Sequence, residues 1–140
     1  MLWLRKSKKG FTLIELMVVV AIIGVLALLG LRLYTGQQEK AKNAIVKANV
    51  GTIQTLIQAE LADKTTTAVN TMWTDGSLIT NSGIHNPVTG AIQAGKPTSL
   101  ATTADGEVWV GFTSDVFSIN GNTAGTTDEN VYATSLTARK

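Results

Sequence analysis

The chain has 140 residues, enough for one small domain, and its hydrophobic fraction of 44% is concentrated near the amino terminus. It has no cysteine and a single histidine, His85, which excludes disulfides, thiol catalysis and multi-histidine metal sites within one chain. The first ten residues hold four of the twelve basic residues and none of the ten acidic ones, so without them the net charge falls from +2 to −2. The composition therefore gives no support for a basic surface that binds nucleic acid.

A short basic head, MLWLRKSKKG, precedes an almost uninterrupted apolar segment at residues 11–31. As an α-helix this segment would be about 31 Å long at roughly 1.5 Å per residue, close to the thickness of a bilayer's hydrocarbon core. Because basic residues gather on the cytoplasmic side of a span, we expect the amino terminus inside the cell. An ordinary secretory signal peptide has a shorter apolar core and a small-residue cleavage site after it, and no such site follows Leu31.

The helical pattern continues beyond the apolar segment to about Ala62. Apolar residues recur there at three- and four-residue steps, which predicts one apolar stripe on an otherwise polar helix. The stripe consists of Ala41, Ala44, Ile45, Ala48, Ile53, Leu56, Ile57 and Leu61. We therefore predict a single helix from about Phe11 to about Ala62, apolar all round in its first half and amphipathic in its second half.

The segment between the helix and Leu100 is rich in turn formers. After a Thr-rich break at residues 64–68, pairs such as Asp75-Gly76 and Asn86-Pro87 indicate a long connecting loop with short extended pieces. We expect this loop to join the helix to a small β domain.

Alternating apolar residues then predict strands at 107–113 and 116–120, joined as a hairpin. Weaker patterns predict a strand near 99–103, a turn at Asp105-Gly106 and a last strand near 131–136. Three or four such strands would form an antiparallel sheet with one apolar face, which the helix stripe covers. The predicted class is therefore α+β, with a leader at 1–10, a helix at 11–63 and a β domain with its connecting loop at 64–140.

One motif decides the interpretation of the amino terminus: Lys9-Gly10-Phe11-Thr12-Leu13-Ile14-Glu15. With its basic leader and the apolar helix behind it, the motif resembles the cleavage site of type IV prepilins, most of all the type IVa branch, and of the related pseudopilins of type II secretion. The resemblance implies that a membrane peptidase cuts between Gly10 and Phe11 and that the new amine of Phe11 is methylated. It also implies a type IV pilin-like fold.

Glu15 is the only charged residue within the apolar segment, where a charged side chain is costly and usually functional. The helix dipole lowers that cost near the helix start, but in a filament without lipid the carboxylate would need a partner. The resemblance supplies one, the amine of Phe11 on a neighbouring subunit. The alternative, a side chain that only reaches the cytoplasmic interface, ignores the Gly10-Phe11 junction beside it.

The chain also departs from the pattern of many family members. Arg32 stands where they have a proline associated with helix unwinding in the assembled fibre, so the helix here either stays intact or unwinds around Gly24 and Gly30. The disulfide common near their carboxyl terminus is missing, which leaves the last loop to packing and hydrogen bonds. Tyr34 matches a frequent aromatic of the family at the membrane exit.

Residues with catalytic or metal-binding chemistry give weaker hypotheses. No nucleophile-elbow motif accompanies His85, so we expect no enzyme. Asp105, Glu107 and Asp128-Glu129 match no calcium loop and fit solvated surface charge better. We therefore expect neither a cofactor nor a metal.

Aromatic and basic residues also allow a binding role. Trp73 and Trp109 could be adhesive aromatics, but a small β domain usually uses tryptophan in its core. Lys40, Lys42 and Lys47 could contact DNA, although a solvated helix face is the simpler interpretation.

The motif and the resemblance together predict a structural subunit of a type IV pilus, which polymerises through its amino-terminal helix into an extracellular filament for adhesion, twitching motility or DNA uptake. The expected partners are further copies or other pilins, the prepilin peptidase, the inner-membrane assembly machinery and the membrane, with DNA or surface ligands as further candidates. The precursor would cross the inner membrane once, and the mature subunit would lie in the pilus. A type II secretion pseudopilin is the alternative, and the Gly10-Phe11 junction together with Glu15 disfavours a membrane-anchored binding domain that never polymerises.

Overall fold

The computed structural model describes residues 10–125 and 129–140, so the predicted leader at 1–10 lies outside the described residues except for Gly10. The chain divides into two compact units, Met1–Gln37 and Gln38–Lys140. One helix, α1 (Leu13–Asp63), contributes residues to both units. Its bounds confirm the long helix that the sequence predicts.

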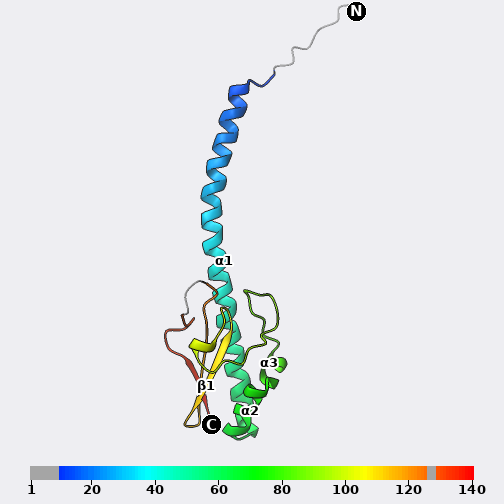
Figure 1. Ribbon diagram of the computed structural model, residues 1–140, viewed down its shortest axis with the longest axis vertical. Helices are drawn as coiled ribbons and strands as arrows, with labels where there is room; N and C mark the ends of the chain where they lie inside the picture. Colours follow the sequence, from blue (N-terminus) through cyan, green and yellow to red (C-terminus); the bar gives the residue numbers. More distant parts are fainter. Residues whose placement is uncertain (1–9, 126–128) are drawn as a thin grey trace, which may run out of the picture. The chain divides into compact units, whose positions relative to one another are not determined.

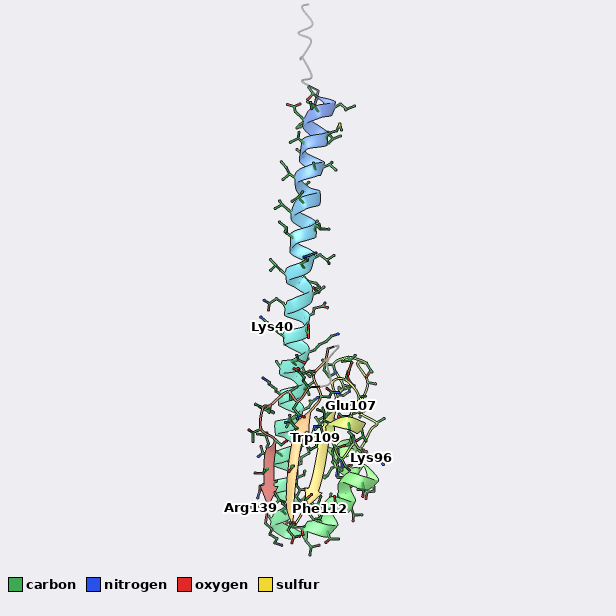
Figure 2. All side chains as sticks on the ribbon, turned by 60° about the vertical axis from the view of Figure 1, so that its left-hand side comes forward. Lys40, Lys96, Glu107, Trp109, Phe112 and Arg139 are labelled. Atoms are coloured by element: carbon green, nitrogen blue, oxygen red, sulfur yellow. The ribbon has the colours of Figure 1, made fainter. Side chains whose placement is uncertain are left out.

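The first unit consists of the amino-terminal part of α1, and every described residue in it is exposed. Apolar side chains project from this part of the helix on all sides (Figure 2). A helix that is apolar all round is normally buried, either inside protein or in a membrane. This unit therefore needs surroundings that a single copy in water does not provide.

The second unit contains residues 38–63 of α1, two short helices and a three-stranded antiparallel sheet (Figure 1). The helices are α2 (Thr66–Asp75) and α3 (Ser77–Ser82), followed by a 3-10 turn, η1 (Leu100–Thr102). The strands are β1 (Val108–Thr113), β2 (Val116–Gly121) and β3 (Leu136–Arg139), in the order β1-β2-β3. The predicted α+β class, with the second half of the helix against an antiparallel sheet, is confirmed.

The hairpin between β1 and β2 turns at Ser114 and Asp115, whose φ angles are 51° and 65°. Two consecutive left-handed residues match the right-handed twist of paired strands, which is why short polar residues occupy this turn. The Asp115 carboxylate also accepts a hydrogen bond from Thr66 Oγ1 at 2.5 Å, which ties the hairpin tip to the start of α2. The predicted hairpin is confirmed.

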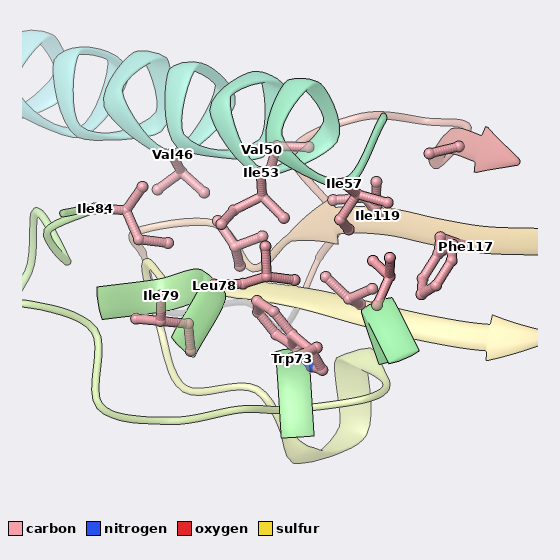
Figure 3. Packing of buried hydrophobic residues seen from close by; sticks show 14 of the residues in the cluster. Val46, Val50, Ile53, Ile57, Trp73, Leu78, Ile79, Ile84, Phe117 and Ile119 are labelled. Atoms are coloured by element: carbon pink, nitrogen blue, oxygen red, sulfur yellow. The ribbon is translucent and has the colours of Figure 1, made fainter. Parts of the chain in front are cut away.

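The core of the second unit lies where α1, the sheet and the short helices converge (Figure 3). From α1 it receives Val46, Val50, Ile53, Ile57 and Leu61; from β1 and β2 it receives Val108, Val110, Phe117 and Ile119. Trp73 of α2 is fully buried among them, and its indole N–H donates to Pro97 O at 3.3 Å. Each fully buried side chain of this size stabilises the fold by about 1.5–3 kcal/mol relative to exposure.

The predicted helix stripe was wrong in its first half. Ala41, Ala44, Ile45 and Ala48 are exposed, and the core is instead built from Val46 and Val50. The sheet comes very close here, because a Cβ on Gly121 would lie 2.4 Å from Val46 Cγ1. Two polar contacts fix the same helix face: Asn43 Oδ1 accepts from Ala124 N at 2.7 Å, and Asn49 Nδ2 donates to His85 O at 2.8 Å.

The connecting loop predicted between residues 64 and 100 is wrong in its first part, which forms α2 and α3. The Thr65 side chain caps α2 by accepting from Ala68 N at 3.2 Å, and Gly76 ends it in a left-handed conformation with φ of 89°. A side chain at Gly76 would also collide with Lys96, whose Cε would lie 2.7 Å from the added Cβ. The threonines of this segment thus serve as helix residues and as a cap rather than as a break.

Two strand predictions also need correction. The segment near 99–103 forms the 3-10 turn η1, because Ser99 O accepts from both Thr102 N and Thr103 Oγ1. The last strand lies at Leu136–Arg139 rather than at 131–136. The predicted turn at Asp105-Gly106 is confirmed, with Gly106 at φ of 77°.

Hydrogen bonds from α1 hold the last strand in place without a disulfide. Gln54 Nε2 donates to Thr137 O at 3.0 Å, and Gln58 Nε2 donates to Arg139 O at 3.1 Å. These side-chain amides satisfy carbonyl groups of β3, a strand at the edge of the sheet.

Candidate functional site

The candidate site is the amino end of α1, where Gly10 and Phe11 precede the first helical turn. Thr12 stands immediately before Leu13, the first residue of α1, and so occupies the N-cap position. Its backbone N–H and Oγ1 donate to Glu15 Oε2 at 2.8 Å and 2.6 Å, and Glu15 N donates back to Thr12 Oγ1 at 3.3 Å. These reciprocal bonds form a capping box, which satisfies two N–H groups that the helix leaves unpaired at its start.

The capping box also determines how much hydrogen-bonding capacity remains on the Glu15 carboxylate. One oxygen, Oε2, accepts both bonds from Thr12, while Oε1 accepts none within the described residues. A carboxylate has lone pairs for several donors, so this one is held in position and can still accept from a cation. Sequence reasoning singled out Glu15 and missed Thr12, although the spacing Thr-x-x-Glu before an apolar run is a recognised start of a helix.

The apolar residues that follow pack against none of the other described residues. Phe11 is 82% exposed, and the large side chains from Leu13 to Tyr34 are exposed as well. In the described residues α1 is the helix long and apolar enough to cross a membrane. The site therefore combines one positioned carboxylate with an apolar surface that water does not favour.

Gly24 and Gly30 lie within this exposed apolar segment. A Cβ added at either position would meet nothing within 4 Å, and both residues are helical. No contact within the described ranges therefore requires glycine at these two positions.

The structure brings no catalytic group together around His85. The residue is exposed, its backbone forms an isolated bridge with Ile92, and its ring makes no hydrogen bond with the described residues. Within the described ranges, no three His, Asp or Glu side chains gather as a metal site. Asp128, one of the acidic residues compared above with calcium loops, lies outside the described residues.

The two tryptophans and three lysines occupy different environments. Trp73 is in the core, while Trp109 is half-buried and donates from its indole N–H to Asn130 Oδ1 at 3.0 Å. Lys47 lies 5.6 Å from the ring centre of Tyr132, and Lys40 and Lys42 make no hydrogen bond or ion pair with described residues. These lysines do not form one shared site.

Comparison with known proteins connects the amino-terminal site to a family. The pattern described as the prokaryotic N-terminal methylation motif matches residues 5–31. The type IV major fimbrial protein FimA of Dichelobacter nodosus is 32% identical over 108 residues, which cover 74% of this chain and 69% of FimA. This chain belongs to the type IV pilin family. It is most like the type IVa branch, and the comparisons do not favour a type II secretion pseudopilin.

Other relatives match over shorter stretches of the chain. Fimbrial protein EcpB of Eikenella corrodens is 47% identical over 56 residues, which cover 40% of this chain and 35% of EcpB. The type IV major alpha-pilin of Moraxella bovis is 42% identical over 55 residues, which cover 39% and 35% of the two chains. A second FimA of Dichelobacter nodosus is 37% identical over 81 residues, so the chain spans about a third of EcpB and about half of this FimA. No solved structure matches this chain.

Proposed function

We propose that this pilin is the structural subunit of a type IV pilus, matured by cleavage between Gly10 and Phe11 and by methylation of the Phe11 amine. The observation that carries the proposal is the exposed apolar helix with a capped carboxylate, Glu15, a few residues after the cleavage junction. The family membership and the fimbrial relatives support a structural role over an enzymatic one.

Assembly follows from the geometry of the helix start. In the precursor, the bilayer surrounds residues 11–31 and the basic leader stays on the cytoplasmic side. In the filament, the same segments from many copies pack together by van der Waals contact, with Gly24 and Gly30 letting helices approach closely. Both states exclude water from the apolar side chains, so transfer between them does not expose this surface.

Glu15 supplies the register that apolar packing lacks. One apolar turn of the helix resembles the next, so hydrophobic contact alone does not select a single axial offset between copies. Glu15 Oε1 accepts no bond in the described residues, and cleavage creates a cationic amine at Phe11. Pairing that amine with Glu15 of a neighbouring copy places both charges together, and an unpaired charge in such a core costs about 3–5 kcal/mol.

Maturation and assembly by this mechanism require several partners. They are a membrane peptidase that recognises Gly10-Phe11, the inner-membrane machinery that extracts the subunit, and further copies or other pilins in the filament. The precursor resides in the inner membrane with its amino terminus inside, and the mature subunit is extracellular.

Mass spectrometry of filaments sheared from the cell surface tests the proposal. The expected subunit begins at Phe11, carries a methylated amine and lacks residues 1–10. Gly10→Leu should block processing and leave the full-length precursor in the membrane, whereas Ser7→Leu, within the leader, should be processed normally. Filaments composed of subunits that still begin at Met1 would contradict the proposal.

A further inference from the structure

The second unit has an open cleft on its surface, between the turns at residues 86–94 and 103–107, with a volume of about 640 Å³. Asn86, only 4% exposed, holds the two turns together: its Nδ2 donates to Asp105 O at 2.8 Å and its Oδ1 accepts from Val88 N at 2.7 Å. Gln93 fixes the far side of the cleft: its Nε2 donates to Val108 O at 2.7 Å, and its Oε1 accepts from Val108 N at 2.8 Å. The cleft is therefore a built feature, whose walls are held by buried and satisfied polar groups.

The lining of the cleft combines aliphatic side chains with unpaired acidic ones. Val88 and Ile92 are 45% and 55% exposed. The carboxylates of Asp105 and Glu107 form neither a hydrogen bond nor an ion pair with any described residue (Figure 2 labels Glu107). Such a surface suits an occupant with an aliphatic side chain next to a positive charge.

The same unit displays a surface of that chemistry on α1. We call it the outer patch, and it consists of Ala41, Lys42, Ile45 and Ala48. Ile45 is 47% exposed, and its neighbours on the helix surface lie three or four positions away. The Lys42 ammonium makes no ion pair or hydrogen bond with described residues.

These two surfaces account for all the exposed large hydrophobic side chains in the described part of the second unit. They are Ile45 on the outer patch and Val88 and Ile92 in the cleft. Each surface has one sign of unpaired charge, basic on the outer patch and acidic in the cleft. Complementary surfaces on one chain fit a second copy of that chain, because every copy then uses both surfaces at once.

From this complementarity we infer that the outer patch of one copy docks in the cleft of the next, with Ile45 against Val88 and Ile92 and with Lys42 beside Asp105 and Glu107. The inference rests on the proposed function, since it adds a second contact to the filament that the helices form. The contact joins two different surfaces, so it repeats from copy to copy and need not close into a ring.

Cysteine cross-linking in native filaments tests this contact, and the natural chain has no cysteine to interfere. Cells should express Ile45→Cys and Ile92→Cys as two separate full-length chains that assemble together. Oxidation of their filaments should give a disulfide-linked dimer, and filaments with either variant alone should give none. Because each chain carries a single cysteine, a link within one copy is impossible.

Charge reversal gives a second measurement that needs no cysteine. Glu107→Lys should lower the filament yield several-fold, and adding Lys42→Glu in the same chain should restore most of it. Glu129→Lys is the matched control, since Glu129 is an exposed carboxylate outside the cleft, and should leave the yield unchanged.

The outcomes separate this inference from the proposed function. If the natural chain forms filaments but Ile45→Cys and Ile92→Cys never cross-link, and Glu107→Lys behaves like Glu129→Lys, the docking contact is wrong and the pilus role stands. Equal labelling of Ile92→Cys by a soluble maleimide in filaments and in free subunits would also overturn the contact, because the cleft would then be open to an external ligand. If the natural chain forms no filaments, both proposals fail.

Discussion

The two units of this pilin differ in whether their apolar side chains are buried within a single copy. In Gln38–Lys140 a core of valine, isoleucine and aromatic side chains is closed within one chain, and Ile57 and Trp73 are completely buried. In Met1–Gln37 every described residue is exposed, although the segment is the most apolar part of the sequence. One helix supplies residues to both, so the difference arises from what surrounds it and not from helix propensity.

The comparison shows how a subunit can be stable before assembly and still be driven to assemble. The second unit buries a hydrophobic core of its own within a single copy. The first unit keeps its helix through local hydrogen bonds and the Thr12–Glu15 capping box, and requires lipid or other copies for its side chains. Substitutions should therefore change folding in one unit and assembly in the other.

The largest expected effect comes from an isoleucine of α1 that faces the core. In a fragment that begins at Gln38, Ile57→Asp should abolish the folded state, because an unpaired carboxylate in that core costs several kcal/mol and a small domain has only about 5–15 kcal/mol of stability. Ile45→Asp is the matched control on the exposed face and should fold normally. Circular dichroism with thermal melting measures both, and a folded Ile57→Asp fragment would mean that this face is not buried.

The next effect concerns the first unit and should appear only in filaments. In the double variant Gly24→Leu with Gly30→Leu, an added Cβ at either position has no described atom within 4 Å. The helix should therefore form at least as well as before, because replacing glycine improves helix propensity by roughly 1 kcal/mol per position. In the filament the larger side chains should keep helices apart and reduce resistance to heat and shear. Gly36→Leu, outside the segment 11–31, is the control. Filaments of unchanged stability would show that the glycines are not at a contact.

A smaller effect should follow from loss of the hydrogen bonds that hold β3. Gln54→Ala with Gln58→Ala removes two bonds to strand carbonyls, each worth about 0.5–1.5 kcal/mol, so the fragment should melt several degrees lower yet stay folded. Hydrogen exchange should speed up at Thr137 and Ala138 more than in β1. Uniform loss of protection across the sheet would argue against a local role for these amides.

The smallest effect is a dependence on acid pH at the junction of α2 and α3. The Ser77 backbone N–H, 2.8 Å from Asp75 Oδ1, is the main reason that the pKa of Asp75 lies below its usual value, and the Ser77 side chain and Lys96 add to it. A lowered pKa in the folded state stabilises the fold above the unfolded pKa, and the gain is lost as the pH falls through the folded pKa. Asp75→Asn should therefore melt slightly lower at neutral pH. The difference should begin to shrink near the ordinary aspartate pKa of about 4 and should vanish only below the lowered pKa of the folded state. A difference that persists in acid would point to packing instead.

The parts of this structure that the sequence predicts are those whose signals are local. The amino-terminal span, the helix bounds and the motif around Gly10 each depend on neighbouring residues. The hairpin is similar, because alternation in β1 and β2 and the polar pair Ser114-Asp115 specify strands and turn within a dozen residues. The signal for the cap at Thr12, the spacing Thr-x-x-Glu, is equally local, but the cap was not predicted.

The parts that the sequence did not predict depend on distant partners. Ala44, Ile45, Val46 and Ala48 are all apolar, and the face that turns inward is decided by the close approach of Gly121 and by contacts of Asn43 and Asn49. Alanine is tolerated in solvent, so periodicity alone cannot fix the phase of the stripe. The exposed position of Ile45 is informative, because it makes this residue part of the outer patch, the surface that we infer contacts another copy.

The most direct test of the account is Glu15→Leu in the full chain, measured in the membrane and on the cell surface together. We predict that the variant inserts and is cleaved normally but that surface filaments fall at least about tenfold, because the buried Phe11 amine loses its partner and about 1.4 kcal/mol already corresponds to a factor of ten. Thr12→Ala, which breaks the capping box and keeps the carboxylate, should lose far less. Abundant, normally ordered filaments built from Glu15→Leu subunits alone would contradict the account.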